Sequence, residues 1–196
     1  IDFGRLVTAS VMLKCFKSGK ERIWWAMDEH VTIGRTTDWH FQTIKGSGKY
    51  DVSEIIGLAY PPPAKTTPNS QTDGSDYTIA RNQGFTVTPA WYTLFHRKHR
   101  FSMVNALFCD AKHTRRLFVA SDEALRPRAP KLVESCMNLL YEGDGRVGTI
   151  KKGHLADLTH YTDALGYGLI PWEHIRGSDE QVTSTQAKKV QWYEEQ

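Results

Sequence analysis

Three side chains that could carry out chemistry recur at steps of three residues near the end of the sequence: Asp157, His160 and Asp163. The apolar residues between positions 155 and 169 repeat at steps of three and four, which predicts a helix. The three polar side chains should share one side of that helix. Asp163 is followed at once by Ala-Leu-Gly-Tyr, so it should be half-buried, where an unpaired charge is costly. We therefore expect it to face a basic side chain or a metal ion, unless it only offsets the helix dipole.

A further carboxylate, Asp2, ends the first predicted strand, far from Asp163 in the sequence. Acids at strand and helix positions beside one sheet suit metal-dependent phosphodiester hydrolysis. Mg²⁺ and Mn²⁺ take oxygen ligands, and a pair of ions stabilises both the attacking and the leaving oxygen. The sequence thus predicts a two-metal site at Asp2 and Asp163, with His160 and Asp157 as partners of the ligating carboxylates. Zinc held by His154, His160 and Asp157 is a weaker alternative, because residues six apart lie on different sides of a helix.

Basic side chains are clustered in a chain whose formal net charge is +3. Each cluster alone is typical of a solvated surface. Beside a carboxylate site they indicate a polyanion partner, because Lys and Arg hold phosphates. The side chains expected to contact the phosphates of such a partner are Arg97, Lys98, Arg115, Arg116, Lys151 and Lys152.

The chain has 196 residues, of which 40% are hydrophobic and 24% charged, as in one ordinary soluble domain. No apolar run is long enough to span a membrane, and no secretory leader opens the sequence. Its three cysteines, Cys15, Cys109 and Cys136, lack metal-type spacing and are expected to be reduced, partly buried thiols of an intracellular protein. The first four residues look like the end of a strand whose beginning is missing, which suggests a fragment of a larger polypeptide.

Strand and helix patterns alternate along the chain. The expected elements are a hairpin over residues 5–28, a helix over 38–45, a central strand over 52–60, a helix over 76–83, a strand over 85–88, a helix over 97–108, a strand over 117–120, a helix over 130–141 and the helix that carries Asp163. This order predicts an α/β fold with a mixed central sheet flanked by helices. Residues 1–175 should form one domain, followed by a polar tail over 176–196.

Several motifs, in this order, resemble the nuclease domain of the large terminase subunit of tailed bacteriophages. The matching segments are Asp2-Phe-Gly, Asp28-Glu29 after a strand, Ser75-Asp-Tyr opening a helix, Val104-Asn-Ala-Leu-Phe-Cys-Asp-Ala with Arg116-Leu-Phe-Val following, and His160-Tyr-Thr-Asp163-Ala-Leu-Gly-Tyr. The resemblance covers roughly residues 1–172. It implies an RNase H-like fold, similar to the RuvC-type resolvases.

The activity that this resemblance implies is cutting of concatemeric double-stranded viral DNA when packaging starts and ends, with Mg²⁺ or Mn²⁺ as cofactor. The implied partners are an ATPase domain upstream in the same polypeptide, the small terminase subunit and the portal, all in the host cytoplasm. The ATPase phosphate loop does not occur in this sequence. Asp2 and Asp163 match the metal-binding aspartates of the family, and Glu29 matches an acid that often lies near the site.

The sequence departs from the family at one position. The family usually has an aspartate at the end of the third strand, where this chain has Leu58 and Ala59 after Gly57. Either the site is natively altered or an aspartate was engineered away at 58 or 59. Two further hypotheses therefore stand beside an active endonuclease. One is a catalytically impaired RNase H-like domain that only binds DNA or a partner subunit, and the other is a resolvase or transposase of the same fold.

Overall fold

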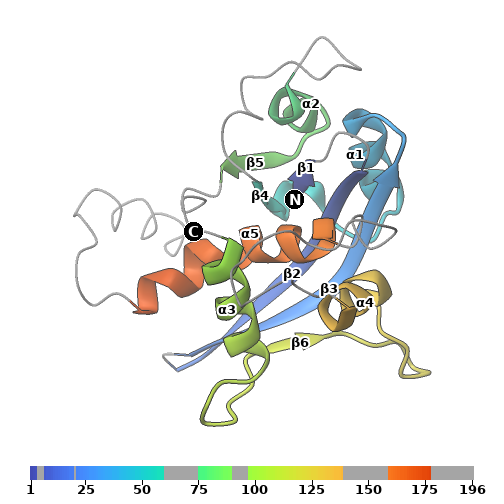
Figure 1. The fold of residues 1–196 in the computed structure, drawn as a ribbon. Helices are drawn as coiled ribbons and strands as arrows, with labels where there is room; N and C mark the ends of the chain where they lie inside the picture. Colours follow the sequence, from blue (N-terminus) through green and yellow to red (C-terminus); the bar gives the residue numbers. More distant parts are fainter. Residues whose placement is uncertain (4–6, 20, 60–74, 90–96, 139–158, 178–196) are drawn as a thin grey trace.

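The computed structural model describes residues 1–3, 7–19, 21–59, 75–89, 97–138 and 159–177 (Figure 1). Its strands are β1 (Asp2–Phe3), β2 (Val7–Ser18), β3 (Glu21–Ile33), β4 (Ile56–Ala59), β5 (Thr86–Pro89) and β6 (Leu117–Val119). Its helices are α1 (Thr37–Gly46), a 3₁₀ turn over Val52–Glu54, α2 (Asp76–Asn82), α3 (Arg97–Phe108), α4 (Pro130–Asn138) and α5 (Thr159–Gly177). This order confirms the expected α/β class.

The central sheet is mixed. Its strands lie in the order β1-β2-β3-β6; the first three are antiparallel, and β6 runs parallel to β3. Strands β4 and β5 form a second, parallel pair. This pair lies beside the first strand, because the N-terminal ammonium of Ile1 donates a hydrogen bond of 2.6 Å to the carbonyl oxygen of Leu58 in β4. The long β2–β3 hairpin confirms the expected opening hairpin.

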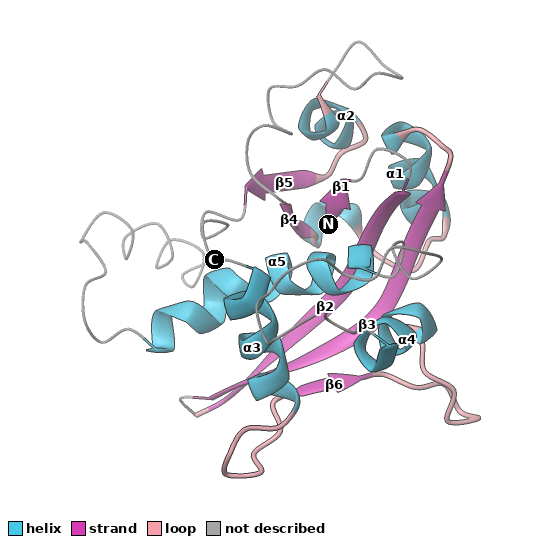
Figure 2. Ribbon diagram, viewed as in Figure 1, coloured by secondary structure: helices cyan, strands magenta, loops and turns pink. Residues whose placement is uncertain are grey.

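Helices cover the two faces of the central sheet. Side chains alternate between the faces of a strand, so Ala9 of β2 points to one face and its neighbour Ser10 to the other. Figure 2 shows α3, α4 and α5 in front of the strands, on the Ala9 face. The main core on that face consists of Ala9, Trp24, Ala26, Val104, Leu107, Leu117, Ala129, Leu132, Tyr161, Leu165 and Leu169. A second core, around Phe41, Ile44, Ala80 and Phe85, joins α1 and α2 to the β4–β5 pair.

Helix α1 is fixed at its start and by a buried histidine. Thr36 caps the helix by accepting a hydrogen bond from the backbone N–H of Trp39, which satisfies a donor that the first turn leaves free. His40 is 1% exposed, and its ring nitrogens lie 2.8 Å from the Ser10 hydroxyl and 2.7 Å from the Thr32 hydroxyl. These two bonds attach α1 to β2 and β3. Burial lowers the pKa of His40 to about 3, so the ring is neutral.

Two expectations from the sequence were wrong. The strand expected over residues 52–60 is divided into a 3₁₀ turn and the shorter β4. The reason is local: the carboxylate of Asp51 accepts hydrogen bonds from the backbone N–H and the hydroxyl of Ser53, which favours a turn over an extended chain. The three cysteines are exposed rather than partly buried. Cys136 belongs to α4, and the buried residues of that helix are Leu132 and Ser135.

Helix α5 continues past Pro171 to Gly177, two residues beyond the expected end of the domain. Tertiary contacts hold the part of the helix that follows the proline. The indole N–H of Trp24 donates to the carboxylate of Glu173 at 2.7 Å, and Arg22 donates to the carbonyl oxygen of Trp172 at 3.0 Å. Across the described ranges, none of the helices is both long enough and apolar enough to cross a membrane.

Candidate functional site

Asp2 and His160 meet where the first strand passes under the last helix. The Nδ1 atom of His160 lies 2.5 Å from a carboxylate oxygen of Asp2, across 158 positions of sequence. A carboxylate can only accept a hydrogen bond, so His160 carries a proton on Nδ1 and donates it to Asp2. The side chains keep 25% and 14% of their surface accessible, so both can be reached from solvent. This pair is the centre of the candidate site.

Asp163 lies one helical turn after His160 but has a different partner. It is 4% exposed, and its carboxylate forms an ion pair with the guanidinium of Arg100 from α3. The guanidinium also lies over the ring of Tyr167, 4.6 Å from its centroid. Gly166 makes this approach possible, because a Cβ at that position would lie 2.4 Å from two carbons of the Arg100 side chain. Asp163 was expected to face either a basic side chain or a metal ion. In the structure its partner is the basic side chain of Arg100.

Glu29 binds the start of a helix. Its two carboxylate oxygens accept the backbone N–H groups of Lys131 and Leu132, at 2.8 and 2.7 Å. These are donors that the first turn of α4 cannot satisfy internally, and a carboxylate also complements the helix dipole there. The pairing of strands places Glu29 on the same sheet face as Asp2, because Val11 opposes Glu29 and Ala9 opposes Asp2. Burial raises the pKa of Glu29, against the effect of the two N–H donors.

The positions where the family usually has an aspartate lie in β4. Ala59 is fully buried, whereas Leu58 is half-buried and lines a groove beside Ile1. Neighbouring residues of a strand point to opposite faces, so only one of the two can face the groove. Neither side chain can bind a cation.

A two-metal site would need several oxygen ligands around one point. Within the described ranges, no group of three or more His, Cys, Asp and Glu side chains is placed to hold a metal ion. Asp2 could offer one carboxylate to an ion. The carboxylate of Asp163 is already engaged in its ion pair with Arg100. Asp157 and His154, the other predicted members, lie outside the described residues. The described residues therefore do not fit a two-ion site in this arrangement.

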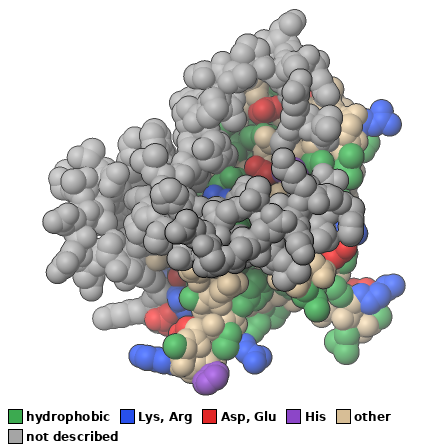
Figure 3. Space-filling model, viewed as in Figure 1, with side chains coloured by type: hydrophobic (Ala, Val, Ile, Leu, Met, Phe, Trp, Pro, Cys, Tyr) green, Lys and Arg blue, Asp and Glu red, His purple; other side chains and the backbone are tan. Residues whose placement is uncertain are grey.

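The residues expected to bind DNA phosphates differ in their surroundings. Arg115 is exposed just before β6. Arg116 is instead paired with Glu173 at 2.8 Å and lies 3.7 Å from Glu21. Its charge is therefore already neutralised by carboxylates of the protein itself. Positions 97 and 98 open α3, while Lys151 and Lys152 lie outside the described residues. Figure 3 shows blue Lys and Arg side chains in separate places at the lower and right-hand edges of this face.

Sequence reasoning missed Arg100 as the partner of Asp163. Arg100 follows Arg97 and Lys98 in a basic stretch of the sequence, which by itself is typical of a solvated surface. A signal was present: Arg100, Val104 and Leu107 recur at helical spacing, and both apolar members are buried. An arginine on the apolar side of a helix needs a buried anion, and Asp163 was the acid predicted to be half-buried.

Comparison with known proteins adds no family to this description: no protein-family model matches the chain, and neither the curated proteins nor the solved structures include a significant match.

Proposed function

We propose that this chain is an RNase H-like domain of the terminase-nuclease type, which binds double-stranded DNA and belongs to a viral genome-packaging enzyme. The observation that carries the proposal is the contact between Asp2 and His160. It brings together the first strand and the last helix, which hold the first and the last of the motifs that resemble the family. The proposed activity is cutting of concatemeric DNA with Mg²⁺ or Mn²⁺.

The order of the strands supports an RNase H-like sheet. The sheet expected for that fold is mixed, begins with an antiparallel hairpin and is flanked by helices. Here β1, β2 and β3 are antiparallel, and the parallel pair β4–β5 lies beside Ile1. Helices on both faces fit the same architecture.

The reaction would require a divalent ion held between Asp2 and Asp163, and the described residues do not fit one in the arrangement seen here. The chain's own contribution is clearer for Asp2, whose carboxylate is oriented by His160 and can be reached from solvent. Asp163 could bind such an ion only after its ion pair with Arg100 had broken. We therefore propose that the nuclease activity of this chain is weak. An ATPase domain, the small terminase subunit and the portal remain its proposed partners.

Nicking of supercoiled plasmid with Mn²⁺ tests the activity. Asp2→Asn should abolish cutting while the melting temperature stays close to that of the parent, because Asn keeps the shape of the side chain and an oxygen that can accept the hydrogen bond from His160. The matched control is Asp122→Asn, a change in a turn after β6 where Asp122 accepts hydrogen bonds from the backbone and the side chain of Arg126. If Asp2→Asn cuts as fast as the parent chain, the site assignment is wrong. Preference for branched over linear DNA would favour a resolvase or transposase.

A catalytically silent DNA-binding domain is the second candidate. Two observations favour it: the Arg100–Asp163 ion pair and the apolar side chains of Leu58 and Ala59. The ion pair engages one carboxylate that would bind an ion, and at positions 58 and 59 the sequence has no carboxylate. This candidate predicts duplex binding without cutting, and a melting temperature that Mn²⁺ does not raise.

A further inference from the structure

The side chain of Arg100 lies against helix α5 as a cation of the protein itself. It comes from the first turn of α3, is 5% exposed and forms the ion pair with Asp163. Its guanidinium lies 4.6 Å from the ring centroid of Tyr167, and its Cγ and Cδ atoms lie against Gly166. Because that position carries no side chain, the arginine can approach the backbone of α5. Arg100 therefore occupies the space beside the Asp163 carboxylate.

Two features make this an unfavourable place for an arginine that only joins two helices. The first turn of α3 has the sequence Arg-Lys-His-Arg, and the helix dipole opposes cations at the N-terminal end of a helix. In addition, the Nε atom of Arg100 is buried and donates no hydrogen bond within the described residues, which leaves part of its desolvation uncompensated. A neutral side chain at position 100 would avoid both costs. What the arginine does provide is a positive charge beside Asp163.

Asp163 lies near the part of α5 that meets Asp2. His160, three residues earlier, is about one helical turn away, and its Nδ1 atom lies 2.5 Å from a carboxylate oxygen of Asp2. A divalent ion shared by Asp2 and Asp163 would have to approach the carboxylate that Arg100 now contacts. Like charges repel strongly where water is largely excluded, so the guanidinium and such an ion exclude each other.

We propose that Arg100 is an autoinhibitory counter-ion, which fills the cation position beside Asp163 and keeps divalent ions from binding there. The inference rests on the proposed function, because it concerns carboxylates that a nuclease of this type would use. Gly166 shares in this regulation, since a side chain at that position would overlap Arg100. The poor fit of the described residues to a two-ion site then depends in part on one contact, which the movement of a single side chain removes.

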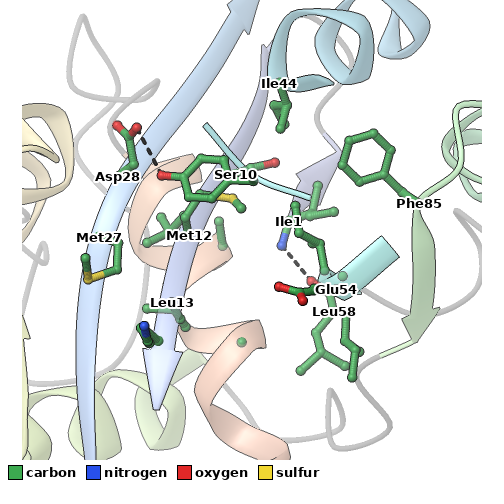
Figure 4. Close-up of a pocket in the computed structure, with 18 of the residues that line it drawn as sticks. Ile1, Ser10, Met12, Leu13, Met27, Asp28, Ile44, Glu54, Leu58 and Phe85 are labelled. Carbon is green, nitrogen blue, oxygen red and sulfur yellow. Dashed lines mark hydrogen bonds between the residues drawn. The ribbon is translucent and has the colours of Figure 1, made fainter. Parts of the chain in front are cut away.

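The test displaces Arg100 without changing either charge. Gly166→Ala adds a Cβ that would overlap the Cγ and Cδ atoms of Arg100, so the arginine must move away. Alanine is a better helix former than glycine, so α5 itself should tolerate the change. The matched control is Gly168→Ala in the same helix. Its Cβ would meet the end of the Leu13 side chain, at the wall of the groove shown in Figure 4.

The measurement is Mn²⁺ binding, followed by the electron paramagnetic resonance signal of the free ion. Gly166→Ala should bind Mn²⁺ more tightly than the parent chain by about tenfold or more, because a fixed positive charge no longer lies beside Asp163. Gly168→Ala should bind like the parent. Adding Asp163→Asn to Gly166→Ala should remove the gain, which assigns it to this carboxylate. Thermal unfolding without Mn²⁺ establishes that each chain is folded.

A second pair of variants changes the charge directly. Arg100→Gln should gain Mn²⁺ binding as Gly166→Ala does, whereas Arg100→Lys, which keeps the positive charge, should bind like the parent. The proposal is overturned if folded Gly166→Ala or folded Arg100→Gln binds Mn²⁺ no more tightly than the parent. It is also overturned if neither variant folds, because Arg100 is then a structural counter-ion only. A gain in Mn²⁺ binding without nicking would support this inference and count against the proposed nuclease, so the two can fail separately.

Discussion

The carboxylate of Asp163 and the guanidinium of Arg100 form an ion pair in which both side chains are almost completely buried, at 6% and 5% exposure. Helix α5 and helix α3 are joined through this contact. Removing one member of a buried pair leaves the other charge without compensation, which costs about 3–5 kcal/mol.

Asp163→Asn should therefore lower the free energy of unfolding by about 3–5 kcal/mol. The double variant Arg100→Met with Asp163→Leu should recover much of that loss, because it removes both charges at similar volume. Urea unfolding of the three chains measures both effects. A single variant as stable as the parent would mean that Arg100 finds another anion, and any loss of nicking in Asp163→Asn must be compared at equal folded fraction.

The pH dependence of stability should carry the signature of His40. The folded protein keeps His40 neutral down to about pH 3, whereas the unfolded chain takes up a proton near pH 6.5. The unfolded state binds more protons in that window, so stability falls as pH falls from about 6.5 toward 3, by up to about 1.4 kcal/mol per pH unit. His40→Gln should be less stable at neutral pH, since it loses the bonds to Ser10 and Thr32, but should show a shallower slope.

The control for this pH series is His113→Asn. His113 is exposed and has a positive φ of 61°, which Asn tolerates better than most residues. Unfolding curves of this variant should keep the slope of the parent. A His40→Gln chain whose slope equals that of the parent would contradict the assignment.

Restoring a carboxylate in β4 should have different effects at the two candidate positions. Leu58 lines the groove and is half-buried, so Leu58→Asp can keep contact with water. Ala59 is fully buried, so Ala59→Asp buries a charge and should unfold the domain or lower its stability by several kcal/mol. If the family site is retained, Leu58→Asp should raise Mn²⁺-dependent nicking by about tenfold or more. The control is Leu58→Asn, which has the same shape without the charge; equal nicking by Asp and Asn would contradict the prediction.

Two adjacent arginines should respond differently to salt. Arg115→Ala should flatten the log-log dependence of DNA binding on salt by about 0.9, the value for one phosphate contact. Arg116→Ala should leave that slope unchanged and lower stability instead, because it removes the partner of the buried Glu173. Filter binding at several salt concentrations and urea unfolding separate the two. A change of slope in Arg116→Ala alone would mean that the Glu173 pair opens on DNA.

The sequence by itself determined most of the elements, the strand expected over residues 52–60 excepted, because helices and strands follow from local periodicity and from capping residues. Thr36 and Ser75 cap the helices expected after them, and the hairpin, α3, β6 and α4 lie where their patterns predict. It also indicated that Asp163 would be partly buried and face a cation, since an acid beside Ala-Leu-Gly-Tyr lies against the packed side of its helix. Both inferences rest on residues within one or two helical turns.

Only the tertiary structure decided which partner each charge has. Arg100 meets Asp163 across 63 positions, Glu29 meets the start of α4 across 102, and Asp2 meets His160 across 158. No local pattern encodes these pairs, because they depend on how α5 crosses the sheet and on the absence of a side chain at Gly166. A buried charge is stabilised by whichever opposite charge the packing brings within reach, so the chemistry of Asp163 is set by the fold and not by its neighbours in sequence.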